Sequence, residues 1–149
     1  MSEIKKRLSS ILESPQGSRD EKLKKVCQLL DHEVSYFNWT GFYFKDGDKE
    51  QLVLGPFVGA DTDHKVIPFG KGICGQVAVS GETYLVPDVN SADNYLSCSI
   101  DTKAEIVVPI FKDGENIGQI DIDSHTIDPF SNEDKELLEW LSEEVAKIL

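Results

Sequence analysis

Two aspartates two residues apart are the strongest chemical signal in this chain. Asp121 and Asp123 belong to the run 117–124, whose alternation of apolar and polar residues predicts a β-strand. Side chains alternate across a strand, so both carboxylates share one face. Aspartate is depleted in strands, and like charges on one face repel each other. The pair therefore indicates either a functional site or a solvated strand face, and the spacing alone leaves both interpretations open.

Cys74 is a second candidate, because it lies in the glycine-rich run 70–75, just before a short apolar segment that stops at Gly81. This pattern predicts a tight turn that leads into a short helix, with Cys74 at the helix N-terminus. Unpaired backbone N–H groups and the helix dipole favour the thiolate there, which is the nucleophilic form of cysteine. A small residue packed between glycines is the alternative. A phosphate-binding loop fits less well, since the glycine spacing matches neither phosphate fingerprint.

The other two cysteines lie in different surroundings. Cys98 belongs to the polar loop 90–99, so we expect it to be more accessible than Cys27. The acidic residues near Cys98 disfavour its thiolate. Cys27 lies on the apolar stripe of a predicted helix, where a small buried side chain is the expected role. Local electrostatics alone therefore favour Cys74 as the more reactive thiol.

Two aromatic residues flank a glycine in the run 39–44. Trp39 and Tyr43 are four residues apart in a predicted strand, so they share one face with Gly41 between them. A gap above the glycine, bounded by two aromatic rings, would form a slot for a small apolar group. Ordinary core packing is the alternative.

The remaining patterns predict helices at both ends of the chain and two hairpins between them. Helical spacing covers residues 3–13, 19–35 and 131–149. Hairpin patterns pair 39–44 with 51–58 and 105–111 with 115–124. Ser131 and Asp134 occupy the positions of a capping box at the start of the last helix. Together these elements predict an α+β domain, in which helices pack on a mostly antiparallel sheet.

Length and charge restrict the class of protein further. A chain of 149 residues that is 40% hydrophobic predicts one globular domain over residues 1–149. A net charge of -12 repels phosphate backbones and anionic lipids, so we expect no nucleic-acid or membrane partner. The chain has no apolar run long enough for a membrane span or a signal core, which predicts a cytoplasmic protein. The three cysteines include no CxxC pair and the three histidines are scattered, so we expect no metal site.

These stretches together resemble a GAF domain, and within that group the free methionine-(R)-sulfoxide reductases. The resemblance is carried by residues 38–43, 54–57, 67–75, 105–109 and 121–124, and by the unbroken spacing from Asp88 through Cys98 to Glu105. It implies a GAF fold, with a central mostly antiparallel sheet flanked by N- and C-terminal helices. It also implies reduction of free L-methionine (R)-sulfoxide to methionine through a cysteine sulfenic acid and a disulfide, which thioredoxin recycles. No metal or organic cofactor is implied.

The resemblance also implies roles for individual residues. Cys98 matches the attacking cysteine, and Cys74 matches a second cysteine that resolves the sulfenic acid. The residues that match substrate contacts are Trp39, Tyr43, Glu105, Asp121 and Asp123. The two aromatics surround the methyl group, and the three carboxylates hold the ammonium and the sulfoxide. Crowded carboxylates cannot all ionise easily, so we expect one of them to have a raised pKa and to protonate the sulfoxide oxygen.

The chain departs from the family at His64, which stands where the family typically has a third cysteine. Only Cys74 then remains to resolve Cys98. The helix-terminus argument favours Cys74 as the attacker and the family match favours Cys98. We predict that Cys98 is the attacking cysteine, because a nucleophile must first be able to reach the substrate, and its pKa matters only after that.

Two functions are compatible with this departure from the family. One is an enzyme that works with two cysteines, and the other is a non-catalytic GAF module that binds a small amino-acid-like ligand. A sensor usually needs an attached output domain, for which this chain has no room, so we favour the enzyme. We also expect a homodimer through the N-terminal helices.

Overall fold

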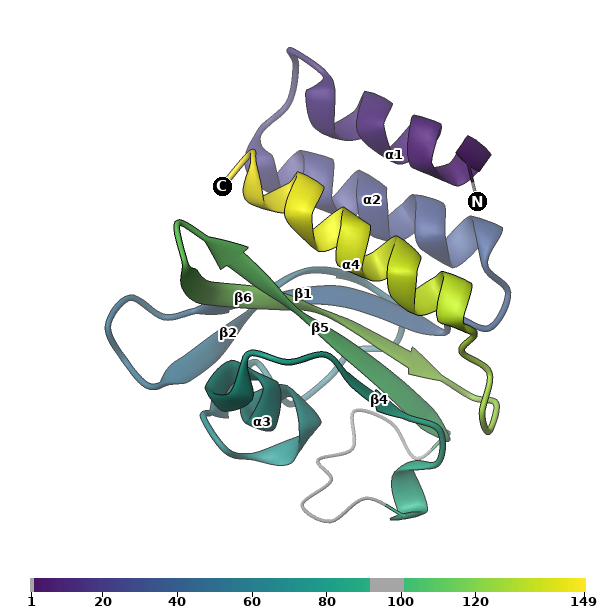
Figure 1. Ribbon diagram of the computed structural model, residues 1–149, viewed down its shortest axis with the longest axis vertical. Helices are drawn as coiled ribbons and strands as arrows, with labels where there is room; N and C mark the ends of the chain where they lie inside the picture. Colours follow the sequence, from purple (N-terminus) through teal and green to yellow (C-terminus); the bar gives the residue numbers. More distant parts are fainter. Residues whose placement is uncertain (1, 92–100) are drawn as a thin grey trace.

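The computed structural model describes residues 2–91 and 101–149, which form a sheet with helices on both faces (Figure 1). The strands are β1 (Trp39–Lys45), β2 (Gln51–Val58), β3 (Val66–Pro68), β4 (Tyr84–Val86), β5 (Ala104–Lys112) and β6 (Glu115–Ser124). The helices are α1 (Ser2–Glu13), α2 (Arg19–Glu33), α3 (Gly72–Ser80) and α4 (Asn132–Ala146), with a short 3-10 helix, η1, at Val89–Ser91. The strand order is β3-β2-β1-β6-β5-β4, and each neighbouring pair is antiparallel. The predicted α+β class is confirmed.

The two faces of the sheet bury different kinds of side chain. Helices α2 and α4 cover one face, α1 packs on the outside of these two helices, and α3 covers the other face (Figure 1). Phe42, Ile106 and Ile122 point into the apolar core beneath the three helices, whereas Tyr43 and Val107 belong to a smaller core beneath α3. This division follows from the alternation of side chains along each strand. The aspartates of β6 lie on the α3 side, because they alternate with Ile120 and Ile122.

Local sequence signals account for where α2 and α4 begin and where α3 ends. Ser18 and Glu21 form a capping box at the start of α2, and Ser131 and Asp134 form the predicted one at the start of α4. Helix α3 ends at Gly81, which has the left-handed backbone that glycine adopts without strain.

The β5–β6 hairpin turns at Asp113 and Gly114, whose φ angles are 53° and 81°. Two consecutive positive φ angles suit the twist of an antiparallel pair, which explains the predicted turn. The predicted pairing of β1 with β2 is also confirmed, with an irregular register between Gly41 and Tyr43. The short edge strands β3 and β4 have no counterpart among the predicted elements. Each has three residues, too few to show a strand period, and pairing with β2 or β5 is what makes them strands.

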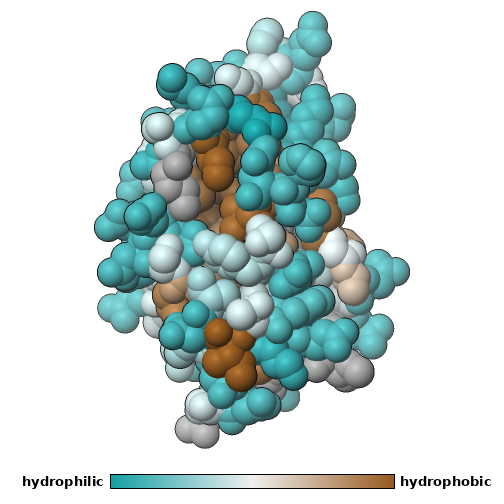
Figure 2. Space-filling view, turned by 90° about the vertical axis from the view of Figure 1, so that its right-hand side faces the viewer, coloured by the Kyte–Doolittle hydropathy of each residue, from teal (hydrophilic) through white to brown (hydrophobic). Residues whose placement is uncertain are grey.

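Hydrophilic residues cover most of the face seen in Figure 2, and hydrophobic residues lie in separate areas between them. No helix in the described part of the chain is both long and apolar enough to cross a membrane.

Candidate active site

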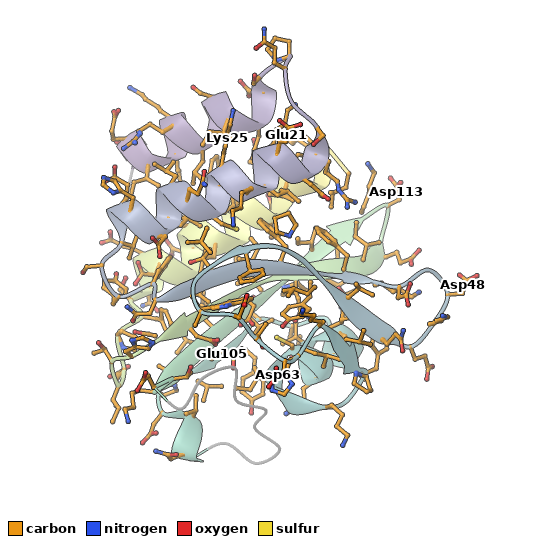
Figure 3. The ribbon with its side chains drawn as sticks, turned by 180° about the vertical axis from the view of Figure 1, so that it is seen from behind. Glu21, Lys25, Asp48, Asp63, Glu105 and Asp113 are labelled. Carbon is orange, nitrogen blue, oxygen red and sulfur yellow. The ribbon has the colours of Figure 1, made fainter. Side chains whose placement is uncertain are left out.

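The central strands bring the acidic residues together beneath α3. Asp123 on β6 lies between Trp39 on β1 and Glu105 on β5, and it pairs directly with each. Asp121 lies one step further along the same face, opposite Gly41. Figure 3 shows Glu105 on the side of the sheet away from α1 and α2. The sequence placed the two aspartates on one face, and the strand register adds Glu105 to them.

All three carboxylates are buried: the exposed fractions are 0% for Asp121, 1% for Asp123 and 3% for Glu105. A solvated strand face is therefore excluded. Burial raises the pKa of Asp121 above its usual range, and polar contacts with Glu105 and Cys74 offset this only in part. No described donor has ordinary hydrogen-bond geometry to either carboxylate oxygen of Asp121. Asp121 thus has the environment of a carboxyl group that stays protonated at higher pH, as predicted for one member of the cluster.

Cys74 lies above these carboxylates in the first turn of α3, as the glycine pattern predicted. Its side chain is buried, with 5% exposed, and its Sγ donates a hydrogen bond of 3.8 Å to Oε2 of Glu105. The sulfur and one oxygen each of Glu105 and Asp121 all lie within 4.8 Å of one another. Such a group is close enough to share a cation, although the spacing of these residues along the chain is not typical of metal ligands. The same group places a thiol beside two carboxyl groups, an arrangement that suits thiol chemistry assisted by an acid.

The space above Gly41 is not the open slot that the aromatic spacing suggested. The ring of Trp39 folds over Gly41, so that a Cβ there would lie 2.5 Å from Cη2 of Trp39 and 2.7 Å from Cβ of Phe57. Trp39 stacks on Phe57 and on Tyr43, with ring centroids 5.3 Å and 6.3 Å apart. Glycine is needed here because the indole rests on the backbone. This arrangement corresponds to ordinary core packing, which was the alternative to an open slot.

The polar atoms of the two aromatics hold the loop 59–65, which connects β2 and β3. Nε1 of Trp39 donates to the carbonyl of Ala60 at 2.9 Å, and the hydroxyl of Tyr43 donates to the carbonyl of His64 at 2.8 Å. The backbone N–H of His64 donates to Oγ1 of Thr62. In Figure 3 this loop, marked by Asp63, crosses the same region as Glu105. The aromatics therefore position the loop as well as fill the core.

His64 lines a small cavity together with Cys74, Glu105 and the start of α3. The cavity has a volume of about 10 Å³, which is enough for one water-sized group. The remaining described residues of its wall are Ile67, Lys71, Gly72 and Ile73. The position at which the chain departs from the family pattern thus lies beside the thiol.

Of the other two cysteines, the structure describes Cys27 but not Cys98. Cys98 lies outside the described residues, so its predicted place in the site is untested. Cys27 is fully buried in the core beneath the helices, where burial raises the pKa of its thiol to about 12. The predicted role of Cys27 as a small buried side chain is confirmed.

Gln119 is a site residue that the sequence predictions missed. It is fully buried on the same face of β6 as Asp121, and its Nε2 donates to the carbonyl of Cys74 at 3.1 Å. The signal was present in the sequence, because Gln119 precedes Asp121 by the same two-residue step that joins the two aspartates. An amide is uncharged, so its type alone does not indicate a site as a carboxylate does.

Comparison with known proteins places this geometry in context. Residues 20–149 match the GAF domain family. The free methionine-R-sulfoxide reductase of Saccharomyces cerevisiae is 39% identical over 152 residues, which cover 94% of this chain and 84% of that protein. The structure of the free methionine-R-sulfoxide reductase from Neisseria meningitidis in complex with its substrate has a TM-score of 0.92 and 33% identity, over 99% of this chain and 86% of that one. The type II enzyme from Thermoplasma acidophilum has a TM-score of 0.84 and 35% identity, over 87% of this chain and 91% of that one.

Proposed function

The chain belongs to the GAF-domain family, and from this premise we propose that it reduces free L-methionine (R)-sulfoxide to methionine. The observation that carries the proposal is the buried group formed by the Cys74 thiol, Glu105 and Asp121. Reduction of a sulfoxide by a pair of cysteines needs an acid to protonate the oxygen and a second thiol to resolve the oxidised cysteine, and this group would supply both. Relatives named for this activity, one of them solved with its substrate, support the same conclusion.

The carboxylates would recognise a free amino acid. Asp123 and Glu105 lie side by side, and an ionised carboxylate binds an ammonium group through charge-assisted hydrogen bonds. In a peptide the corresponding nitrogen is an uncharged amide, which gives these carboxylates no counter-charge. Trp39 and Tyr43 would border the methyl end of the substrate, since they lie on the same face of β1. This arrangement supports free methionine sulfoxide as the substrate.

The first chemical step would be the attack of the Cys98 thiolate on the sulfoxide sulfur. Asp121 would donate its proton to the sulfoxide oxygen, which weakens the S–O bond. The oxygen is transferred to Cys98, the S–O bond of the substrate breaks, and methionine leaves. The substrate gains two electrons, and Cys98 becomes a sulfenic acid.

The second step would be resolution by Cys74. Its thiol attacks the sulfur of the Cys98 sulfenic acid, a disulfide forms, and the oxygen leaves as water. Thioredoxin, a dithiol, would then reduce the disulfide by thiol–disulfide exchange and restore both cysteines. A cycle of this kind suits the cytoplasm, where such reductants keep thiols reduced.

One assay tests the proposal. The reduced protein is incubated with the separated R and S epimers of free methionine sulfoxide and a thioredoxin system, and methionine is quantified. We expect turnover of the R epimer alone. Binding of the R epimer without any methionine would show a non-catalytic ligand-binding module instead.

Matched cysteine variants locate the chemistry in the same assay. Cys74→Ser should stop multiple turnover by thioredoxin, and Cys27→Ser should leave it unchanged, because Cys27 is in the other core. Peptide mass mapping of the wild type after substrate should find a disulfide between Cys74 and Cys98. A disulfide to Cys27 would refute the assignment of the resolving cysteine.

The oligomeric state is a separate part of the proposal. We take residues 1–149 to be one GAF domain that forms a homodimer through its N-terminal helices. Ile4 and Ile11 on α1 are only partly buried, which supports a further partner for this helix. Light scattering after size-exclusion chromatography should give twice the mass of one chain, and the mass of a single chain would contradict the dimer.

A further inference from the structure

Two amide side chains of β6 attach α3 to the sheet. Nε2 of Gln119 donates to the carbonyl of Cys74, in the first turn of the helix. Nδ2 of Asn116 donates to the carbonyls of Val77 and Ala78, near the end of the helix, at 3.1 Å and 3.2 Å. One contact therefore holds the turn that carries the thiol, and the other holds the opposite end.

The contact of Gln119 reaches a turn that has no side-chain cap of its own. The N-cap residue of α3 is Lys71, whose side chain makes no capping hydrogen bond, in contrast to Ser18 in α2 and Ser131 in α4. The first turn of α3 is therefore not fixed by its own cap. Gln119 reaches that turn from the neighbouring strand and fixes the residue that carries the sulfur.

Burial of the Gln119 side chain also destabilises the fold, which is not expected of a residue with a purely structural role. Its side chain is fully buried, and its Oε1 has no hydrogen-bond partner among the described residues. A buried polar atom without a partner destabilises a fold, whereas an apolar side chain of the same shape does not. Apart from the carboxylates, the core beneath α3 is apolar and includes Ile73 and Val77. Packing alone would therefore favour methionine or leucine at this position.

We propose that Gln119 is a positioning residue that sets the orientation of Cys74 for disulfide formation. Its hydrogen bond fixes the distance of the first turn of α3 from the sheet and the rotation of that turn, so that the thiol stays beside Glu105. This inference rests on the proposed function only in giving Cys74 the role of resolving thiol. In that role Cys74 must reach a sulfenic sulfur, and small displacements of a reacting atom slow such steps strongly.

The test compares Gln119→Met with the matched control Asn116→Leu. The reduced proteins receive one equivalent of hydrogen peroxide, which converts an accessible thiol to a sulfenic acid and water. Attack by the Cys74 thiol then forms a disulfide and releases a second water. Dimedone traps the sulfenic acid, and peptide mass mapping of samples quenched over time gives the rate at which the Cys74 disulfide appears.

We expect Gln119→Met to slow formation of the Cys74 disulfide by about 10- to 100-fold and to accumulate trapped sulfenic acid. Its midpoint of thermal unfolding should be equal to or above that of the wild type, because a buried unpaired acceptor is removed. Asn116→Leu should leave the rate unchanged and lower the midpoint. A structural role would instead couple the two readouts, with a lower midpoint in both variants.

Three results would overturn the inference: a wild-type rate in Gln119→Met, equal slowing in both variants, or the absence of any Cys74 disulfide in the wild type. Peroxide replaces the sulfoxide in this experiment, so the outcome is independent of the proposed substrate. A wild type that forms the disulfide but makes no methionine would refute the proposed function and leave the role of Gln119 intact.

Discussion

Asp121 and Asp134 are both fully buried aspartates, but their surroundings differ. Oδ2 of Asp134 accepts hydrogen bonds from the hydroxyl of Tyr36 at 2.7 Å and from the backbone N–H of Ser131 at 2.9 Å. Asp121 has no described donor at comparable geometry. The carboxylate of Asp134 completes a helix cap. Asp121 has no described donor that would stabilise its charged form, as expected for a group that donates a proton.

This contrast predicts opposite effects of the same substitution on stability. Burial raises the pKa of Asp121, so the folded protein holds a proton that the unfolded chain releases above about pH 4. The contribution of Asp121 to stability therefore falls as pH rises from there through the raised pKa. Asp121→Asn removes this fall and should stabilise the protein at pH 8, with little effect at pH 4.

Asp134→Asn is the control, and it should destabilise the protein at neutral pH by about 1 kcal/mol through the weakened cap. Urea unfolding of both variants at the two pH values measures these effects. A loss of stability in Asp121→Asn at pH 8 would mean that the Asp121 carboxylate is paired in the folded state. In the reductase assay Asp121→Asn should lose about 100-fold or more in rate, as expected for removal of a general acid.

Cys27 is a buried thiol that should resist modification in the folded protein. Because burial raises the pKa of Cys27 to about 12, this thiol stays protonated at neutral pH and unreactive. Iodoacetamide at pH 7.5 should therefore leave Cys27 unlabelled in the folded protein and label it after unfolding. Mass mapping of the labelled peptides checks this, and rapid labelling of Cys27 in the native protein would contradict its place in the core.

At the scale of elements, α3 is the part that decides the geometry of the site. Its first turn packs so closely on the preceding loop that a Cβ on Gly75 would lie 2.7 Å from the carbonyl oxygen of Pro68 and 3.0 Å from the backbone nitrogen of Gly70. Backbone atoms cannot swing aside as a side chain can. The glycine is therefore required by close packing, next to the residue that carries the thiol.

Gly75→Ala should shift the first turn of α3 and misplace Cys74. We expect a loss of about 1–3 kcal/mol in stability from overpacking and a larger relative loss of turnover. Val79→Ala on the same helix is the control, because Val79 is 68% exposed and should tolerate the change in both readouts. Thermal unfolding and the methionine assay measure the two effects. Unchanged activity in Gly75→Ala would show that α3 adapts without moving its thiol.

At the scale of the whole molecule, the net charge of -12 is the dominant feature. The ion pairs among the described residues lie at the surface, where each adds little to stability. Repulsion between the excess acidic residues should therefore outweigh them. Salt screens this repulsion over a distance of about 10 Å at 0.1 M.

We accordingly expect the midpoint of thermal unfolding to rise when sodium chloride is increased from about 0.01 M to about 0.15 M, where the screening length falls to about 8 Å. Differential scanning calorimetry at constant pH provides the measurement. A midpoint that falls with salt would mean that attractive ion pairs contribute more than the excess of acidic residues.

Local structure and the identity of the reactive groups could be predicted from the amino-acid sequence. Capping residues, hairpin turns and strand alternation are local signals, so they predicted the long helices, the two hairpins and the shared face of Asp121 and Asp123. The glycines around Cys74 predicted its place at the start of a helix, and the apolar stripe predicted that Cys27 is buried. The family resemblance then pointed to the substrate.

The contacts of these groups follow instead from how distant segments pack together in the fold. Packing of α3 on β5 and β6 buried the carboxylates, placed the Cys74 sulfur beside Glu105 and joined Gln119 to the first turn of the helix. The ring of Trp39, stacked on Phe57 of β2, closed the expected slot above Gly41. Strand periodicity says which residues share a face, but burial and contact depend on which distant segment covers that face. A raised pKa or an unpaired acceptor arises only when that covering segment excludes water.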